Sequence, residues 1–215
     1  MRPHCLPRLT ISPLARRILP LLLILALLPL LTSCRYLPGG RRILAGQEVR
    51  DAQELLDQGL TADALAAFER AIELSPRLAQ AHLGAAEIYR VQGDYEAAAD
   101  AYGEAALSQP SNFDAHFGQG LMLQLLERFA EAVRSYLRAV QLRPTSAPAN
   151  LNLATAYLQI GDAAQAVPYA ERAVDLDPGN GAAHMNLGTI YSRVERHDEA
   201  LYEFEAAYSM LGPRP

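Results

Sequence analysis

The 215-residue sequence contains no tryptophan and no lysine, so all 19 of its basic residues are arginines. Its two cysteines are Cys5 and Cys34, and because none follows residue 34, the later region cannot form an internal disulfide. The sequence also lacks a glycine-rich phosphate loop, a nucleophile paired with a base, and two carboxylates at a catalytic spacing. We therefore expect no catalytic residues, no cofactor and no metal site.

Acidic residues are absent from the first 33 positions, which carry four arginines. The remaining 15 arginines face 24 acidic residues, a formal charge of −9. The arginines form no stripe along this acidic chain, and a clustered basic surface is what nucleic acid requires. This balance argues against nucleic acid as a partner.

The first 33 residues have the organisation of an exported leader. Arginines come first, and an apolar run of 14 residues, 18–31, follows them. As a helix this run would reach about 21 Å, which is short of the ~30 Å hydrocarbon core of a bilayer. Residues 1–33 are therefore interpreted as a signal peptide.

The run ends in Leu31-Thr32-Ser33-Cys34, which resembles the lipobox of bacterial lipoproteins. The resemblance implies cleavage before Cys34 and lipid attachment to this residue, with residues 34–44 as a tether. Acyl chains add about 0.8 kcal/mol per buried CH₂, so several chains give a lasting anchor. The alternatives are an ordinary signal peptide with an incidental cysteine, an uncleaved anchor, or twin-arginine export. Because Arg35 and not Asp follows the cysteine, the resemblance favours the outer membrane over the inner membrane, facing the periplasm.

Beyond the tether the chain repeats with a period of 34 residues. Four prolines mark it: Pro76, Pro110, Pro144 and Pro178. Counting each proline as position 32 gives five repeats, at 45–78, 79–112, 113–146, 147–180 and 181–214. Position 8 is always Ala or Gly, positions 20 and 27 are always Ala, and position 24 is aromatic in all but the fourth repeat. This pattern resembles the tetratricopeptide repeat, and its period is typical of that family.

The resemblance implies an all-α fold, a right-handed α-solenoid of five helix-turn-helix repeats. Small residues let the helices cross closely, and large residues fill the remaining space. Asp94 and Asp162 follow glycines and are expected to cap second helices. Pro168 predicts a kink or a late helix start in the fourth repeat. Asp51 and Gln119 occupy position 7, which is usually apolar, so we expect looser packing there.

The resemblance places the first helix of each repeat on a concave groove. Position 5 is apolar throughout: Val49, Leu83, Phe117, Leu151 and Met185. These residues either form a trough for a peptide or pack as core. Asn152 and Asn186, at position 6, either bind a peptide backbone, as their amides allow, or are only consensus residues. Position 4 carries His82, His116 and His184, which we interpret as structural residues and not as metal ligands.

The last helix has an apolar face on which a sixth repeat would dock, formed by Leu201, Phe204, Tyr208 and Leu211. It is either an interface, including one between two copies of the chain, or a frayed end.

The sequence predicts a lipid-tethered scaffold that binds envelope proteins through its groove. By resemblance to tetratricopeptide-repeat lipoproteins, the expected role is pilus or secretion-system assembly. An adaptor for a protease or cell-wall hydrolase and a factor for outer-membrane protein assembly are the alternatives.

Overall fold

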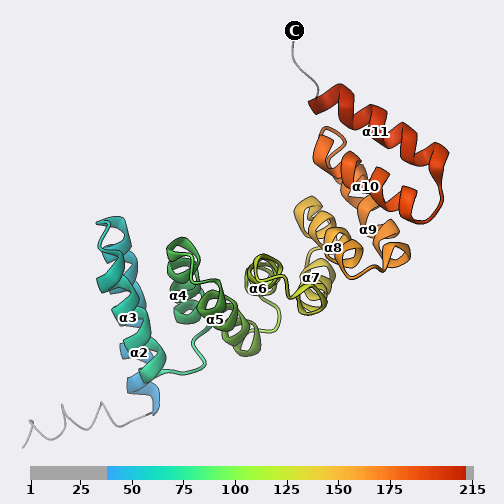
Figure 1. The fold of residues 1–215 in the computed structure, drawn as a ribbon. Helices are drawn as coiled ribbons and strands as arrows, with labels where there is room; N and C mark the ends of the chain where they lie inside the picture. Colours follow the sequence, from blue (N-terminus) through green and yellow to red (C-terminus); the bar gives the residue numbers. More distant parts are fainter. Residues whose placement is uncertain (1–37, 212–215) are drawn as a thin grey trace, which may run out of the picture.

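The computed structural model describes residues 38–211, which form ten α-helices and contain no strand. Consecutive helices pair, so the described chain consists of five helix pairs (Figure 1). This confirms the predicted all-α solenoid. The helices are α2 (Pro38–Asp57), α3 (Thr61–Leu74), α4 (Ala79–Gln92), α5 (Tyr95–Ser108), α6 (Phe113–Leu125), α7 (Phe129–Leu142), α8 (Ala147–Gln159), α9 (Ala163–Leu176), α10 (Gly181–Arg193) and α11 (His197–Leu211).

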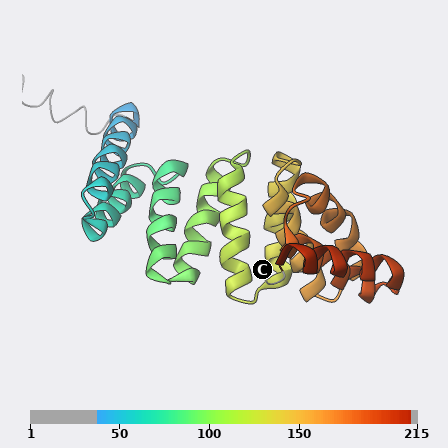
Figure 2. The ribbon, with the colours of Figure 1, turned by 90° about the horizontal axis from the view of Figure 1, so that it is seen from above.

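The pairs follow one another along a curve. The first helices α4, α6, α8 and α10 lie towards its inner side, and the second helices α5, α7 and α9 lie towards its outer side (Figure 1). Seen from above, the pairs stand side by side (Figure 2). Each pair therefore contacts only its neighbours, as expected of a repeat array. The curve presents a continuous inner surface made of first helices.

Small residues are buried where the helices cross. The alanines at positions 20 and 27 are at most 3% exposed in every repeat. A leucine in place of Ala132, which is 0% exposed, would overpack its crossing at a cost of about 1–3 kcal/mol. The rings at position 24 occupy the space beside them, because Phe68, Tyr102 and Tyr136 are at most 3% exposed. The predicted small–large complementarity is thus present in the core.

Position 15, at the turn inside each repeat, takes a left-handed backbone conformation in all five. Glycine supplies it three times, at Gly59, Gly93 and Gly161, with φ of 76°, 81° and 83°. Glu127 and Glu195 adopt it with φ of 57° and 64°, in the two repeats without that glycine. The predicted caps are confirmed, since the Asp94 carboxylate accepts a hydrogen bond from the Ala97 amide at 3.1 Å. The Asp162 carboxylate likewise accepts from the Gln165 amide at 3.3 Å.

Two expectations about helix limits need correction. Helix α2 begins at Pro38, so residues 38–44, assigned above to the tether, are helical. The extra turns are held against α3, because the Arg41 guanidinium donates to the Glu73 carbonyl at 3.1 Å and Ala45 is fully buried. The signal peptide, Cys34 and the rest of the tether lie outside the described residues.

The second correction concerns Pro168. Helix α9 runs from Ala163 to Leu176 with Pro168 inside it, so a late start, one of the two predicted alternatives, is wrong. The other alternative, a kink, stays a prediction. Pro168 is the sixth residue of that helix and removes only one backbone donor. The Asp162 cap secures the first turn, and the proline ring is exposed on the outer side. The local loss is therefore tolerated.

Position 4 joins each repeat to the one before it. The Nε2 atoms of His82, His116 and His184 lie 2.9, 3.2 and 3.1 Å from the carbonyl oxygens of the prolines six residues earlier. Asn150 donates to the Pro144 carbonyl at 3.1 Å in the same way. A carbonyl only accepts, so each ring nitrogen here carries the hydrogen. These side chains cap the end of the preceding second helix, which supports the structural interpretation of the histidines.

Candidate functional site

The apolar residues at position 5 lie on the first helices and differ in exposure. Val49, Leu83 and Phe117 are half-buried and pack against core clusters. Leu151 is also half-buried, whereas the Met185 side chain is 44% exposed. The stripe is thus partly core towards the N-terminal repeats and opens at the last repeat. Burial therefore supports core packing for the first part of the stripe, and the peptide trough stays a prediction.

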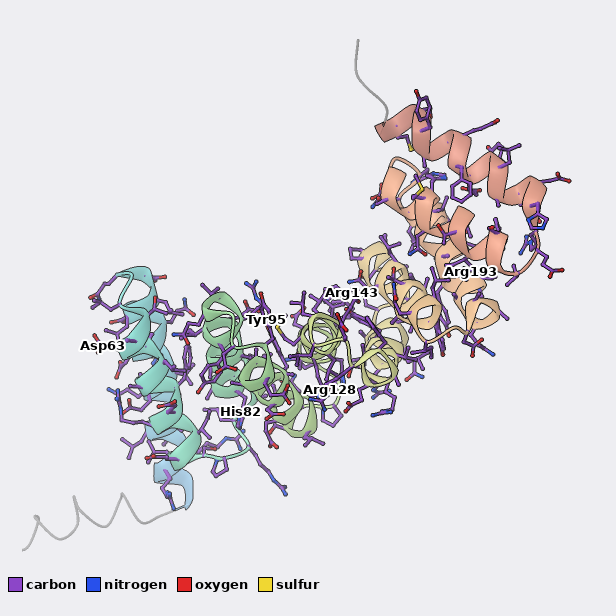
Figure 3. The ribbon with its side chains drawn as sticks, in the orientation of Figure 1. Asp63, His82, Tyr95, Arg128, Arg143 and Arg193 are labelled. Atoms are coloured by element: carbon purple, nitrogen blue, oxygen red, sulfur yellow. The ribbon has the colours of Figure 1, made fainter. Side chains whose placement is uncertain are left out.

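The third repeat carries an aromatic row that the sequence reading did not single out. Phe113 stacks on Phe117 with ring centroids 5.4 Å apart, and Phe117 lies 5.9 Å from the Tyr136 ring. The guanidinium of Arg143 lies 3.8 Å from the centre of the Phe113 ring, a cation–π contact (Figure 3). The two phenylalanines are four residues apart on one helix, and this spacing predicts that their rings contact each other.

The residue at position 6 faces the position-24 ring of the preceding repeat. At Gly84 a Cβ would lie 2.2 Å from the Phe68 ring, and at Gly118 it would lie 2.6 Å from the Tyr102 ring. Glycine is required at both places, because the rings fill the space of a side chain. Asn152 occupies the equivalent position beside Tyr136, whose pKa is raised by burial and lowered in part by the hydrogen bond with this amide.

Asn186 breaks this series, because the fourth repeat has Ala170 and no ring at position 24. The Asn186 amide nitrogen donates to the Thr155 hydroxyl at 2.8 Å, and that hydroxyl donates to the Leu151 carbonyl at 2.9 Å. The Asn186 Oδ1 is buried and has no hydrogen-bond partner among residues 38–211. Exchanging the amide O and N would leave the nitrogen unpaired instead, since the Thr155 hydroxyl is already committed as a donor.

A buried acceptor without a donor costs about 1–3 kcal/mol, so its presence calls for a reason. An added N–H donor would satisfy it, and a polypeptide backbone provides one per residue. The neighbouring Met185 offers a flexible apolar surface on the same helix. The first helices of the fourth and fifth repeats therefore combine an apolar surface with an acceptor in need of a donor.

The remaining candidates lie elsewhere. In α11 the Leu201 and Tyr208 side chains are 59% and 71% exposed, and Phe204 is half-buried against α10. The side chain of Leu211 and all of Cys34 lie outside the described side chains. Among residues 38–211, no three histidine, cysteine, aspartate or glutamate side chains gather as metal ligands would.

The tetratricopeptide-repeat family model matches residues 50–109, 90–147 and 151–215. Helix pairs of this length, stacked at a 34-residue period, define a repeat protein of the α-solenoid class. The chain belongs to the tetratricopeptide-repeat family, whose fold serves as a scaffold for protein–protein interaction. No curated protein matches the sequence.

Solved structures of this family resemble the chain. YrrB, described as a TPR protein with an unusual peptide-binding site, is 26% identical with a TM-score of 0.71, covering 76% of this chain and 84% of its own. MamA from Desulfovibrio magneticus RS-1 is 22% identical with a TM-score of 0.68, covering 78% and 94%. PilF of Pseudomonas aeruginosa is 22% identical with a TM-score of 0.61, covering 81% and 80%. The last two likenesses show the fold alone.

Proposed function

We propose that this protein is a membrane-tethered scaffold of the bacterial cell envelope, which holds a partner polypeptide on the inner side of its fourth and fifth repeats. The observation that carries the proposal is the buried Asn186 Oδ1 without a donor. An incoming backbone N–H pairs with it when the side chain turns towards the guest. Met185, one residue earlier and 44% exposed, covers an apolar side chain of the same guest.

The peptide-binding site described for YrrB supports a peptide as the ligand class. The shape of the array supports it too, since an extended inner surface made of successive first helices suits a chain and not a small molecule. The half-buried Phe113 and Phe117 of α6, with Arg143 over the Phe113 ring, add apolar area on the first helix of the third repeat.

The envelope location rests on the leader. The resemblance of residues 31–34 to a lipobox supports a lipid anchor on Cys34, with the solenoid in the periplasm and the outer membrane favoured by Arg35. None of the helices within residues 38–211 is both long and apolar enough to cross a membrane. The partners are then envelope proteins, and assembly of a pilus or secretion system is the preferred process. Recruitment of a protease or cell-wall hydrolase and assembly of outer-membrane proteins are the competing roles.

Site-specific crosslinking tests the groove. A photoreactive residue at position 185 should capture a defined envelope protein in intact cells, and Asn186→Ala should reduce that product. The same photoreactive residue at position 107 is the matched control, because Leu107 is 76% exposed on the second helix α5. If positions 185 and 107 give the same products, or Asn186→Ala leaves the yield unchanged, the groove is not the binding site.

Metabolic labelling with a fatty acid tests the anchor separately. The wild-type chain should incorporate the label and fractionate with membranes, and Cys34→Ala should abolish both. The Cys5→Ala variant, which changes the only other cysteine, should behave as wild type. Label retained in Cys34→Ala would exclude the lipobox interpretation.

A homodimer through α11 is a second candidate, favoured by one specific comparison. In the first four repeats, the residues at positions 21 and 28 lie against the next repeat and are buried or half-buried. Their equivalents in the fifth repeat, Leu201 and Tyr208, remain apolar and are exposed. A mass measurement in solution should then give a dimer that Tyr208→Asp converts to a monomer. A monomeric wild-type chain would remove this candidate.

A further inference from the structure

The third repeat contains a pocket that is separate from the inner groove. Its volume is about 260 Å³, and α6 and α7 form it. None of the groove candidates lines it. It lies beside Gln119, the polar residue at position 7 where looser packing was expected. The lining residues are His116, Gln119, Leu123, Glu131, Arg134, Ser135 and Arg138.

The pocket contains two arginines, Arg134 and Arg138, whose charges are incompletely paired within the described part of the chain. Arg138 donates to the Gln141 side chain at 3.2 Å and to the Pro110 carbonyl at 3.3 Å, and no carboxylate among residues 38–211 lies within 4.0 Å of it. Arg134 donates to the Ala130 carbonyl at 3.5 Å and lies 3.6 Å from the Glu131 carboxylate. The buried Ser135 hydroxyl donates to the Gln119 Oε1 at 2.9 Å, which fixes that amide and leaves its NH₂ group without an acceptor.

The charge of the pocket is positive. Glu131 is its only acidic lining residue, and Arg128, labelled in Figure 3, offsets part of its charge through two hydrogen bonds of 2.7 and 2.9 Å. Burial lowers the pKa of His116, and the nearby charge of Arg138 lowers it further. Arg134 and Arg138 therefore dominate the field inside the pocket.

In two other repeats, a carboxylate pairs with the residue equivalent to His116 or Arg138. In the first repeat, the arginine equivalent to Arg138 is Arg70, and it pairs at 2.8 Å with the carboxylate of Glu48 at position 4. In the fifth repeat, the histidine equivalent to His116 is His184, and its Nδ1 lies 2.5 Å from the carboxylate of Glu203 at position 23. Each of these repeats supplies a carboxylate from within.

The third repeat has both the histidine at position 4 and the arginine at position 26. It has no carboxylate equivalent to that of Glu48 or Glu203. Position 4 is His116, position 26 is Arg138, and position 23 is Ser135, which is too short to replace Glu203. We infer that this pocket binds a carboxylate group from another molecule, an acidic side chain or a chain terminus of a protein. The pocket is below the ~300–1,000 Å³ of sites for drug-sized ligands, so it accepts one such group and not a whole cofactor.

The chemistry favours a carboxylate over a phosphate. A guanidinium presents parallel donors that match the two oxygens of a carboxylate. Glu131 remains at the edge of the pocket and repels a dianion more strongly than a monoanion. The site would thus hold an acidic group of a partner on a part of the third repeat that the groove candidates do not occupy.

Nuclear magnetic resonance of the purified chain tests this inference with defined probes. N-acetylglutamate 1-amide offers only a side-chain carboxylate, and N-acetylalanine offers only a terminal one. Either should shift the signals of the His116 ring and the Gln119 side-chain amide, and the tighter probe identifies the source. The neutral N-acetylglutamine 1-amide should leave these signals unchanged. Inorganic phosphate binding there while both carboxylates fail would overturn the inference.

Three variants localise the binding. Arg138→Gln should weaken it about tenfold, the loss of one charge-assisted hydrogen bond. Arg172→Gln is the matched control at position 26 of the fourth repeat and should bind as wild type. Ser135→Glu should abolish binding, because it supplies an internal carboxylate as Glu203 does in the fifth repeat. Unchanged binding in both Arg138→Gln and Ser135→Glu would refute the site, whatever the groove proves to bind.

Discussion

The junction between the second and third repeats and the junction between the fourth and fifth use the same two positions in opposite ways. At the first, the Tyr102 ring is 3% exposed and occupies the space above Gly118, where a Cβ would lie 2.6 Å from the ring. At the second, Ala170 and Asn186 occupy the equivalent positions, and the Asn186 amide oxygen has no donor among residues 38–211. One junction is filled by apolar packing, and the other contains an unsatisfied polar group.

Under the proposed function, the first junction contributes stability and the second contributes binding. The ring and the glycine are complementary, so the first junction needs nothing further. The second junction gives up the area of an aromatic ring and bears the cost of an unpaired acceptor. A functional site is where a protein is expected to tolerate an unsatisfied polar group or an incompletely packed junction.

The largest change in stability is expected when the tyrosine ring at the first junction is removed. Tyr102→Ala should lower the free energy of unfolding by about 3–5 kcal/mol, because it leaves a cavity between two helix pairs. Urea denaturation followed by circular dichroism measures it. Tyr202→Ala, at a tyrosine 68% exposed on α11 and outside the proposed interface, is the matched control and should stay within about 0.5 kcal/mol of wild type. Equal effects of the two substitutions would contradict the packing argument.

A smaller effect is expected from closing the space above the ring. Gly118→Ala should destabilise the chain by about 1–3 kcal/mol, because the new Cβ meets the Tyr102 ring at 2.6 Å. Gly46→Ala makes the same change in α2, where the Cβ would meet only the Arg50 guanidinium at 3.9 Å. That control should be neutral or slightly stabilising, since alanine favours helices. Thermal melting of the two variants gives the comparison directly.

Much of the solenoid could be predicted from the sequence because its determinants recur in each repeat. The small residues at positions 20 and 27 reveal the helix crossings, and a cap such as Asp94 acts only three residues away. The start of α2 escaped prediction because Pro38-Gly39-Gly40 is unfavourable locally, and contact with α3 stabilises the turns that follow. Tertiary contact overrode the local preference.

The candidate site was only partly predictable, because its properties depend on pairs of residues in different repeats. Asn186 was identified from its position, but its lack of a partner depends on Ala170, sixteen residues earlier. Position 5 was apolar in every repeat, yet only Met185 is exposed, since exposure depends on what each neighbour covers. Similarly, Gln119 indicated loose packing, but only the fold brings Arg138 to the same pocket.

Exchanging the residues of one junction for those of the other sharpens the comparison. Ala170→Tyr alone should destabilise, because the ring meets the Asn186 side chain. Asn186→Gly alone should change the stability little, because removing the unpaired acceptor offsets the cost of about 0.5–1 kcal/mol for a glycine in a helix. Together they recreate the pair found at Tyr102 and Gly118. A double-mutant cycle should therefore show a favourable coupling of about 1 kcal/mol. Additive effects would mean that the two side chains do not meet.

The smallest expected effect is a pH dependence of the free energy of unfolding that arises at the first junction alone. Burial, and then the hydrogen bond to Glu87, raise the pKa of Tyr102 above its ordinary value of 10.0, and the second junction has no tyrosine at position 24. The folded chain thus keeps the phenolic proton at a pH where the unfolded chain has lost it. This contribution is complete below pH 10 and is lost as the pH rises towards the higher folded value. Between pH 9 and about 11 the free energy of unfolding should fall less in Tyr102→Phe than in wild type. Parallel slopes in the two proteins would show that the buried hydroxyl does not couple proton binding to folding.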